Sequence, residues 1–445
     1  MKQHLVVKLY KRLRDDDDIP DWLDFIHDKS FVKERLVPDF DRVMRDAGAK
    51  FWVVSEHKPA GEYWTDDEVR HGLDRVYRVI LQDDYDLPPD LVARIRLVPG
   101  VEGIHDLAVG EADIPTRPTD GDGGDGGTHR GLAIESSLPM GRAEEMIGLA
   151  YARAITRGQP EVHIAVLDTG VNLDHQELEG KLLPGADFVD LEGLDTTGFI
   201  GDFMGYDDVP EDEVGHGTHV SGIIAARGVA MDEGVAPDCR IMPVRVLATM
   251  KSGDRLVGAG IIDNINTGIK WAVDHGAHVI NMSLGIRHAG GGLPHEDVIR
   301  YALTKNVTVV AASGNDGTAE RYYPGALPGV IAVGAVDPSG VVTPFTSYGA
   351  PITVVAPGTN IYSSFAHNTY AVASGTSQAA PFVTGAVALL HAFARQAGRR
   401  IGFREVTQVL RNTADRGDAQ LRTERAGYGL INLADALKLL AHQFN

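Results

Sequence analysis

Short, continuously apolar runs alternate with helical patterns through most of this chain beyond about residue 135. Apolar runs without a polar face are typical of strands that are buried on both sides, and the intervening helices supply that cover. The alternation predicts an α/β domain with a parallel sheet between two helical layers, in which functional sites form at the carboxyl ends of strands. The segments that carry this pattern are VHIAVLD, HVSGIIAA, RIMPVRVL, IIDNINTGIKWAV, HVINMSLG, VTVVAASGN and VIAVGAV.

The first 114 residues follow a different pattern and predict a small α+β domain. HLVVKLY and AKFWVVSE are strand-like, and DLVARIRLV followed by VEGIHDLAV indicates a helix and then a strand. TDDEVRHGLDRVYRVIL predicts one long helix, which Thr65 and Glu68 begin with a capping box. The buried face of this helix would consist of Val69, Leu73, Val76, Tyr77 and Ile80.

A stretch rich in glycine, proline and aspartate separates the two regions. The segment PTRPTDGDGGDGGTHRG, residues 115–131, contains no apolar run and predicts a flexible linker. Its Asp and Gly content weakly resembles calcium-binding repeats, but the single irregular copy favours a linker. We therefore expect one domain at 1–114, a linker at 115–134 and a second domain at 135–445.

The charge and the terminal sequence predict the class of partner and the compartment. The formal net charge of −20 disfavours nucleic acids and anionic membrane surfaces, because like charges repel on approach. No run of about 20 apolar residues is present, and the apolar stretch in MKQHLVVKLYKRLRDDDD is too short for a signal peptide. The single cysteine, Cys239, is expected to be a buried thiol in a reducing compartment. These features predict a cytoplasmic protein without a nucleic-acid or membrane partner, and they leave export by a non-classical route open.

Three polar residues stand where a strand ends or a helix begins. Asp168 ends VHIAVLD, His216 opens a helix in VGHGTHVSG, and Ser377 opens another helix in SGTSQAAP. Each residue alone has an ordinary structural explanation, as a turn residue, a packed histidine or a helix cap. Together they are the groups that a serine hydrolase needs, namely a nucleophile, a base that takes its proton and a carboxylate that orients the base.

The motifs around these residues are similar to those of a known family. DTG, HGTHVSG and GTSQAAP occur in the order Asp, His, Ser and, with AASGNDG, resemble the subtilisin-like serine proteases, the subtilase family, over about residues 135–445. The resemblance implies a serine endopeptidase that acts through an acyl-enzyme. Asp168 would support His216, His216 would act as general base and then general acid, and Ser377 would be the nucleophile. The family pattern leaves His219 a role in packing or in supporting the catalytic residues from behind.

The same resemblance assigns further site residues. Asn315 in SGNDG matches the family's side-chain donor to the oxyanion, assisted by the backbone N–H of Ser377. An extended peptide or protein segment would bind between two strand edges. Tyr322 falls near the floor of the main specificity pocket and is expected to narrow it. The two edges are Ser283, Leu284 and Gly285 on one side and Gly258, Ala259 and Gly260 on the other.

The resemblance implies that the reaction needs no cofactor. It leaves open whether a structural calcium ion binds. The loop ARGVAMDEGVAP lacks the asparagine-rich ligand pattern of the family's tight calcium site, and Glu177 stands where the family has an aspartate. The stretch GDFMGYDDVPEDE supplies oxygen ligands, although a run of acids is usually a solvated loop. The ligands of a metal ion stay unidentified from the sequence.

The region 1–114 resembles, more loosely, the propeptides of this family, which assist folding and lay a terminal segment into the active cleft. This resemblance implies a zymogen that is inhibited by its own N-terminal domain and processes itself. The region is longer than the common propeptide, which leaves an added role open. Two alternatives to a general protease remain. One is a protease or transpeptidase dedicated to a single leader peptide, and the other is a catalytically silent binding module with a permanently blocked cleft.

Overall fold

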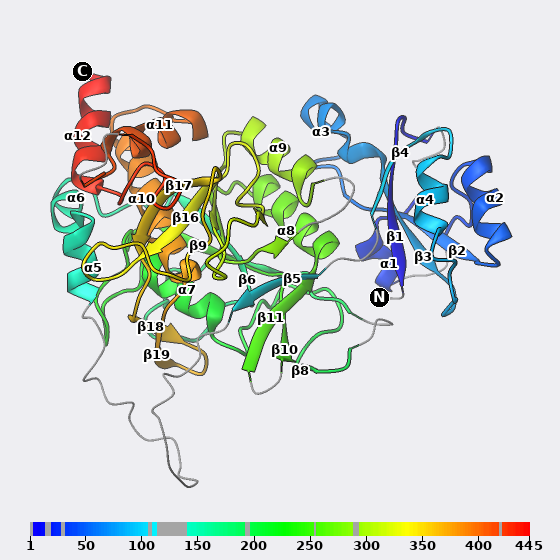
Figure 1. Ribbon diagram of the computed structural model, residues 1–445, viewed down its shortest axis with the longest axis horizontal. Coiled ribbons are helices and arrows are strands. Elements are labelled where there is room, and N and C mark those ends of the chain that lie inside the picture. Colours follow the sequence, from blue (N-terminus) through cyan, green and yellow to red (C-terminus); the bar gives the residue numbers. More distant parts are fainter. Residues whose placement is uncertain are drawn as a thin grey trace, which may run out of the picture.

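The computed structural model has two parts of different architecture (Figure 1). A small antiparallel sheet with short helices forms the N-terminal part at one end, and a larger α/β part contains the rest of the chain. The predicted linker, residues 115–134, lies outside the described residues, so the expected domain boundaries stay predictions. The structure describes residues 3–13, 19–27, 32–105, 109–113, 140–191, 196–252, 255–287, 293–417 and 421–445.

The central sheet of the larger part consists of seven strands: β6 (His163–Asp168), β7 (Ala186–Asp187), β9 (Arg240–Arg245), β12 (Val279–Met282), β14 (Thr308–Ala312), β16 (Ile331–Val336) and β17 (Ile352–Pro357). Their order is β17-β16-β14-β12-β6-β9-β7, and the neighbouring strands are parallel. Ile164 and Val166 of β6 enter one apolar core, whereas Ala165 and Leu167 enter a second core on the opposite face. Strands that face two cores must be apolar on both sides, which explains the unbroken runs and confirms the predicted α/β fold class.

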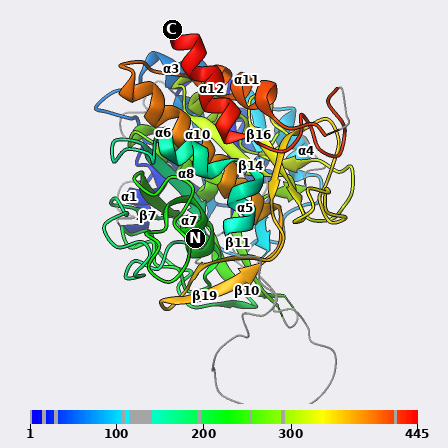
Figure 2. The same ribbon diagram turned by 90° about the vertical axis from the view of Figure 1, so that its left-hand side faces the viewer.

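Helices cover both faces of this sheet. Figure 2 views the molecule from the end that carries α5, α6 and α12. One core packs against α5 (Met140–Met146), α6 (Leu149–Ile155), α7 (His216–Ala225), α10 (Thr376–Gln396), α11 (Phe403–Thr413) and α12 (Leu433–Phe444). The other core packs against α8 (Ile262–Asp274) and α9 (Glu296–Thr304). Helix α10 is long and apolar enough to cross a membrane by composition, but it is almost entirely buried, as expected of a central core helix.

Smaller strands surround the central sheet. Strands β18 (Ile361–Phe365) and β19 (Thr369–Ala373) form a hairpin that packs on α7. Two-residue strands β13 (Ile286–Arg287) and β15 (Tyr322–Tyr323) form a second antiparallel pair. A four-stranded sheet has the order β5-β11-β10-β8, and its members are β5 (Val109–Asp113), β8 (Phe199–Ile200), β10 (Ala248–Ser252) and β11 (Arg255–Ile261).

The N-terminal part has an antiparallel sheet in the order β2-β3-β1-β4, with its own apolar core. Its strands are β1 (His4–Leu9), β2 (Phe51–Ser55), β3 (Val76–Leu81) and β4 (Val101–His105). Its helices are α1 (Trp22–His27), α2 (Pro38–Asp46), α3 (Asp66–His71) and α4 (Leu91–Arg96). The strands and the α4 helix expected from the sequence are present, as is the capping box of Thr65 and Glu68.

The single long helix predicted after Thr65 is wrong. Helix α3 ends at Gly72, which takes the left-handed conformation with φ 71°, and a short 3₁₀ turn follows at Leu73–Arg75. The run VYRVIL then forms β3, in the middle of the sheet between β1 and β2. Branched and aromatic residues fit a pleated, two-sided packing surface well, so tertiary contacts override the helical spacing here.

Polar side chains join the N-terminal part to α8 of the larger part. Trp22 Nε1 donates a hydrogen bond to Thr267 Oγ1 at 3.2 Å, and His4 Nε2 lies 3.0 Å from Asp263 Oδ2. All four residues are buried. The two parts are therefore attached through a packed polar interface as well as through β5, which pairs with β11.

Candidate active site

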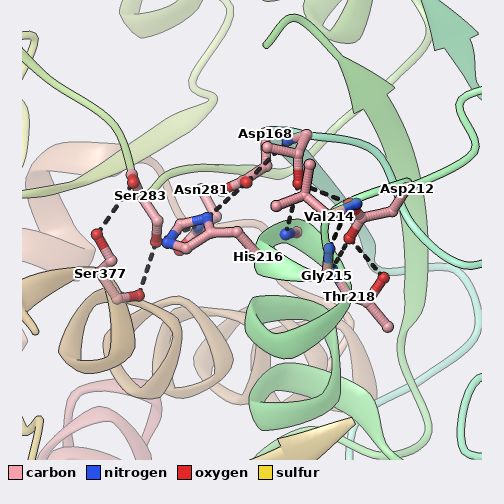
Figure 3. Close-up of polar contacts among 11 residues, drawn as sticks. Asp168, Asp212, Val214, Gly215, His216, Thr218, Asn281, Ser283 and Ser377 are labelled. Carbon is pink, nitrogen blue, oxygen red and sulfur yellow. Dashed lines mark hydrogen bonds and ion pairs between the residues drawn. The ribbon is translucent and has the colours of Figure 1, made fainter. Parts of the chain in front are cut away.

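The carboxyl end of β6 meets the first residue of α7. His216 Nδ1 lies 2.6 Å from Asp168 Oδ1, and both side chains are fully buried (Figure 3). A carboxylate only accepts hydrogen bonds, so Nδ1–H of the imidazole is the donor and Nε2 carries the lone pair in the neutral ring. Gly217 permits this approach, because a Cβ there would lie 2.1 Å from the Gly170 carbonyl oxygen.

A second buried carboxylate, which the sequence analysis missed, holds the two segments of this pair together. Asp212 accepts hydrogen bonds from Thr169 Oγ1 at 2.9 Å and Gly215 N at 2.8 Å, and from the N–H and hydroxyl of Thr218 at 2.9 and 2.6 Å. Thr169 directly follows the strand end, while Gly215 and Thr218 flank the start of α7. Burial raises the pKa of Asp212, and these hydrogen bonds oppose the rise. The residue therefore positions the loop and helix that carry Asp168 and His216.

Ser377 is the second residue of α10, and its side chain is buried. Figure 3 places the His216 ring between Asp168 on one side and Ser377 on the other. Within the described part of the chain, the Ser377 hydroxyl donates to the carbonyl oxygen of Ser283 at 3.1 Å rather than to His216. Ser283 Oγ donates in return to the Ser377 carbonyl oxygen at 2.9 Å. The structure thus brings the three predicted residues together, with the hydroxyl turned toward Ser283.

Asn315 lies opposite the start of α10. Its Oδ1 accepts hydrogen bonds from the backbone N–H of Thr376 at 2.8 Å and from the Thr376 hydroxyl at 2.9 Å. These two donors assign Oδ1 and leave Nδ2 as the donor end of the amide. Asn315 and Ser377 line one cavity of about 370 Å³. Thr376, which the sequence analysis did not single out, therefore sets the orientation of the Asn315 amide beside Ser377.

The predicted pocket residues line the same cavity. Ser283, Leu284, Gly285 and Tyr322 all line it, and the side chain of Tyr322 lies 3.5 Å from the position of a Cβ on Gly285. A Cβ on Gly314 would lie 2.6 Å from this ring, so the ring packs directly on the main chain. Burial, together with the hydrogen bond to Asp316, raises the pKa of Tyr322 to about 12.

A charged rim closes the Tyr322 side of this cavity. Arg287 donates to the Tyr322 hydroxyl at 2.7 Å and also forms ion pairs with Asp316 and Glu320. Arg287 and Asp316 line the cavity, and the sequence analysis did not predict either of them. Strands β13 and β15, whose pairing brings Arg287 beside Tyr322, have only two residues each and left no pattern in the sequence.

The second predicted edge is β11, and the chain's own strand β5 occupies it. Gly258, Ala259 and Gly260 pair antiparallel with Ala112, Glu111 and Gly110, respectively. Ala112 also lines the cavity that contains Ser377. The segment that follows the N-terminal sheet therefore lies along the edge on which an extended peptide was expected to bind.

His219 and Cys239 have structural surroundings. His219 is buried, and its Nε2 lies 3.1 Å from the Ile361 carbonyl oxygen and 3.2 Å from that of Ala371. Burial, aided by the neighbouring His216, lowers the pKa of His219 to about 3. Burial likewise raises the pKa of the Cys239 thiol to about 12. Neither side chain titrates near neutral pH, which suits a packing role.

Comparison with known proteins identifies relatives of this chain. The model of the subtilase family matches residues 159–429. A thermophilic serine proteinase of Bacillus sp. (strain AK1) is 41% identical over 271 residues, which cover 60% of this chain and 59% of the relative. This chain thus spans about three fifths of the length of that relative. Subtilisin Savinase of Lederbergia lenta is 35% identical over 303 residues, covering 68% of this chain and 99% of Savinase. The predicted family resemblance is confirmed.

A solved structure has a related fold. The prenylagaramide maturation protease PagA superposes with a TM-score of 0.53 and is 30% identical in sequence. The match covers 66% of this chain and 98% of the PagA chain. The shared region supports the three-layer architecture described above.

The surroundings of Glu177 do not fit the calcium ion that some subtilases bind. Its buried carboxylate accepts hydrogen bonds from the backbone N–H groups of Gly228, Val229 and Ala230, the shortest at 2.6 Å, and from the Tyr370 hydroxyl at 3.0 Å. Burial opposes ionisation, but these hydrogen bonds outweigh it and lower the pKa of Glu177. Donors that point at the carboxylate would repel a cation. Among the described residues, no group of three or more His, Cys, Asp or Glu is arranged to hold a metal ion.

Proposed function

The chain belongs to the subtilase family of serine endopeptidases, and on this premise we propose that it hydrolyses peptide bonds through Asp168, His216 and Ser377. The observation that carries the proposal is the buried 2.6 Å contact between Asp168 and His216, with Ser377 on the other side of the imidazole ring. The contact orients the ring and stabilises its protonated form. Because the carboxylate receives Nδ1–H, the basic Nε2 is directed away from Asp168.

The reaction begins when the Ser377 hydroxyl turns from the Ser283 carbonyl toward His216. His216 Nε2 takes the hydroxyl proton while Oγ bonds to the substrate carbonyl carbon, and the carbonyl oxygen becomes negatively charged. Asn315 Nδ2 and the backbone N–H of Ser377 stabilise that oxygen. His216 then gives its proton to the leaving amine as the C–N bond breaks. Water releases the acyl group by the same sequence and restores Ser377.

Substrate binds as an additional strand between the β11 edge and the segment 283–285. Backbone hydrogen bonds on both sides hold an extended peptide with little dependence on its sequence, and the cavity beside Tyr322 selects one side chain. The pairing of β5 with β11 supports this binding mode, since it is an extended segment on the same edge. Peptides and unfolded protein segments are thus the proposed substrates, and no cofactor takes part in the chemistry.

The N-terminal part acts as an inhibitor in this proposal. Its last strand, β5, occupies the β11 edge and reaches the cavity of Ser377 through Ala112, so a substrate must displace it. We accordingly interpret 1–114 as an inhibitory and folding domain, 115–134 as a linker and 135–445 as the catalytic domain. The full chain is then a zymogen. Its cytoplasmic location remains a prediction from the terminal sequence and the single cysteine.

The experiment that tests this function compares wild-type protein with Ser377→Ala. Wild type should react with a fluorophosphonate probe and should cut itself between about Gly110 and Met140, because a tethered segment is present at high effective concentration. Most of this range lies outside the described residues. Ser377→Ala should stay unlabelled and remain one chain of 445 residues. A wild type that stays unlabelled even after removal of residues 1–130 would instead identify a catalytically silent binding module.

A dedicated processing protease is the second candidate, because PagA, which matches in fold at 30% identity, is a maturation protease. A protease or transpeptidase of this kind acts on one leader peptide and leaves other sequences intact. Incubation with a mixed peptide library distinguishes the two functions. A general endopeptidase cuts many members at many positions, whereas a dedicated enzyme leaves nearly all of them uncut and, as a transpeptidase, joins an added amine to its product.

A further inference from the structure

A line of buried polar side chains connects the interior of α10 to the turn that carries Ser377. Thr384 Oγ1 donates to Asn281 Oδ1 at 2.7 Å, and Asn281 Nδ2 donates to Ser283 Oγ at 3.1 Å. Ser283 Oγ in turn donates to the Ser377 carbonyl oxygen at 2.9 Å. Thr384, Asn281 and Ser283 have no exposed surface. Figure 3 shows the Asn281, Ser283 and Ser377 end of this line.

The direction of every hydrogen bond in this line follows from its last acceptor. The Ser377 carbonyl can only accept, so Ser283 must donate its single hydroxyl proton there. The Ser283 oxygen is then free to accept from Asn281, which requires the amide nitrogen to face Ser283 and the amide oxygen to face Thr384. The Thr384 hydroxyl must therefore donate to Asn281. The three side chains allow one arrangement, which resists reorientation of any member.

This line lies in an otherwise apolar layer. Asn281 belongs to β12, two residues after Val279, which packs in the same core as α10. A buried amide in such a layer is costly unless its hydrogen bonds are satisfied. Thr384 follows Ser377 by seven residues on α10, about two helical turns, so both residues lie on the same face of the helix. The line therefore connects α10 to β12 and the residue after it at two points. Thr384 bonds to Asn281, and Ser283 bonds to the Ser377 carbonyl oxygen.

We propose that Thr384 and Asn281 are positioning residues that act through Ser283 on the nucleophile Ser377. Two hydrogen bonds join Ser283 to Ser377. The Ser283 hydroxyl donates to the Ser377 carbonyl oxygen, and the Ser283 carbonyl oxygen accepts from the Ser377 hydroxyl. When the main-chain N–H of a substrate takes the Ser283 carbonyl, the Ser377 hydroxyl is released toward His216. The bond from Ser283 Oγ then keeps the Ser377 backbone in place. This inference rests on the proposed protease function.

The test uses two substitutions of Thr384 that separate its hydroxyl from its volume. Thr384→Val keeps the shape and removes the donor, whereas Thr384→Ser keeps the donor and removes a methyl group. The control is Thr407→Val, which removes another largely buried hydroxyl, bonded at 2.7 Å to the Phe403 carbonyl four residues earlier. Each variant is measured for kcat and KM on a fluorogenic peptide, for the rate of fluorophosphonate labelling and for thermal stability.

Thr384→Val should lower kcat and the labelling rate about tenfold or more, with KM within about twofold of wild type, because small displacements of a reacting group slow chemistry strongly. Thr384→Ser should remain within about threefold of wild type in kcat, and Thr407→Val should change only stability. Equal losses of kcat in Thr384→Val and Thr384→Ser, or a wild-type kcat in Thr384→Val, would overturn the proposal.

A measurement that does not depend on catalysis keeps this inference separate from the proposed function. Amide hydrogen exchange in the first turn of α10 should quicken in Thr384→Val and stay at the wild-type rate in Thr384→Ser. Unchanged exchange in Thr384→Val would overturn the positioning role even in a fully active protease. A wild type that neither cuts peptides nor reacts with the probe would overturn the protease function, and exchange would still report on the hydrogen-bonded line.

Discussion

Replacement of Glu177 by glutamine should destabilise the larger part of the protein without loss of a metal ion. The carboxylate accepts hydrogen bonds from three backbone N–H groups of the loop 228–230 and from the Tyr370 hydroxyl, and its side chain has no exposed surface. A glutamine has the same shape but presents an N–H₂ group to part of this donor set. Two of the four donors would then face another donor rather than an acceptor.

The magnitude follows from these four hydrogen bonds. Hydrogen bonds to a charged group contribute about 1.5 to 3 kcal/mol each, and a buried donor without a partner costs about 1 to 3 kcal/mol. The loop residues 227–230 are themselves exposed, so water can bind part of the donors that lose their partner. The cost in stability for the two donors should therefore lie near the lower end of this range. We expect a loss of about 2 kcal/mol in the free energy of unfolding, which corresponds to a fall in Tm of roughly 3 °C in a part of about 300 residues.

The assay is thermal unfolding at pH 7 in the Ser377→Ala background, which prevents self-digestion. Glu179→Gln is the matched control, because it removes the same charge from a largely exposed surface ion pair with Arg227 and should cost less than about 1 kcal/mol. EDTA should leave the Tm of the parent unchanged. Equal Tm values for Glu177→Gln and Glu179→Gln, or a marked fall with EDTA, would refute the reasoning.

The same substitution has a pH signature. The pKa of Glu177 is lower in the folded protein than its ordinary value of 4.5. The folded state therefore binds fewer protons than the unfolded state at that site, and the resulting stability is present above pH 4.5 and lost as pH falls through the folded pKa. The difference in Tm between the parent and Glu177→Gln should accordingly shrink in acid.

Three further predictions concern the proposed chemistry. Ser377→Ala, His216→Ala and Asp168→Ala should each abolish most peptidase activity, and Ser377→Ala combined with His216→Ala should be about as inactive as either alone, whereas multiplied losses would argue against a shared mechanism. Activity should rise between about pH 6 and 8, since His216 must be neutral to accept the Ser377 proton. A kcat/KM that does not change with pH, while the chemical step is rate-limiting, would contradict this role. Tyr322→Gly should raise kcat/KM for peptides with Trp or Phe before the scissile bond relative to those with small residues, and an unchanged ratio would show that the ring does not narrow the pocket.

The central sheet could be predicted because its physical requirement is local. A strand buried on both faces must be apolar at every position, so each strand leaves an unbroken run in the sequence. The error at 65–81 came from a run that satisfies two patterns, since Val76, Tyr77 and Ile80 fit one face of a helix as well as a buried strand. Gly72 was the signal that could have separated them, because glycine in the left-handed conformation commonly ends a helix.

The three motif residues of the site were predicted from their order and surroundings, and the structure brings them together, while their roles stay predictions. Asp212 and Thr376 were missed although both lie close in sequence to a motif residue. Each is a single polar residue with an ordinary local explanation, and the partner that connects it to the site, Thr169 for Asp212 and Asn315 for Thr376, comes from another segment. The line from Thr384 through Asn281 depends entirely on the packing of α10 against β12. Contacts between elements distant in the sequence leave no spacing pattern that a single sequence can reveal.

The N-terminal part is held in a way that a single cut after β5 would not disturb. Arg78 is buried against the Trp22 ring, forms an ion pair with Glu56 and donates to Asn264 of α8 at 3.1 Å. Burial raises the pKa of Glu56 to about 7, while the Arg78 charge opposes the rise. Removing one partner of a buried pair costs several kcal/mol, because the other charge is left uncompensated. Self-cleavage would leave this interface and the pairing of β5 with β11 intact. If the chain is the zymogen proposed above, activation would require a second event that acts on the N-terminal part itself, such as its degradation.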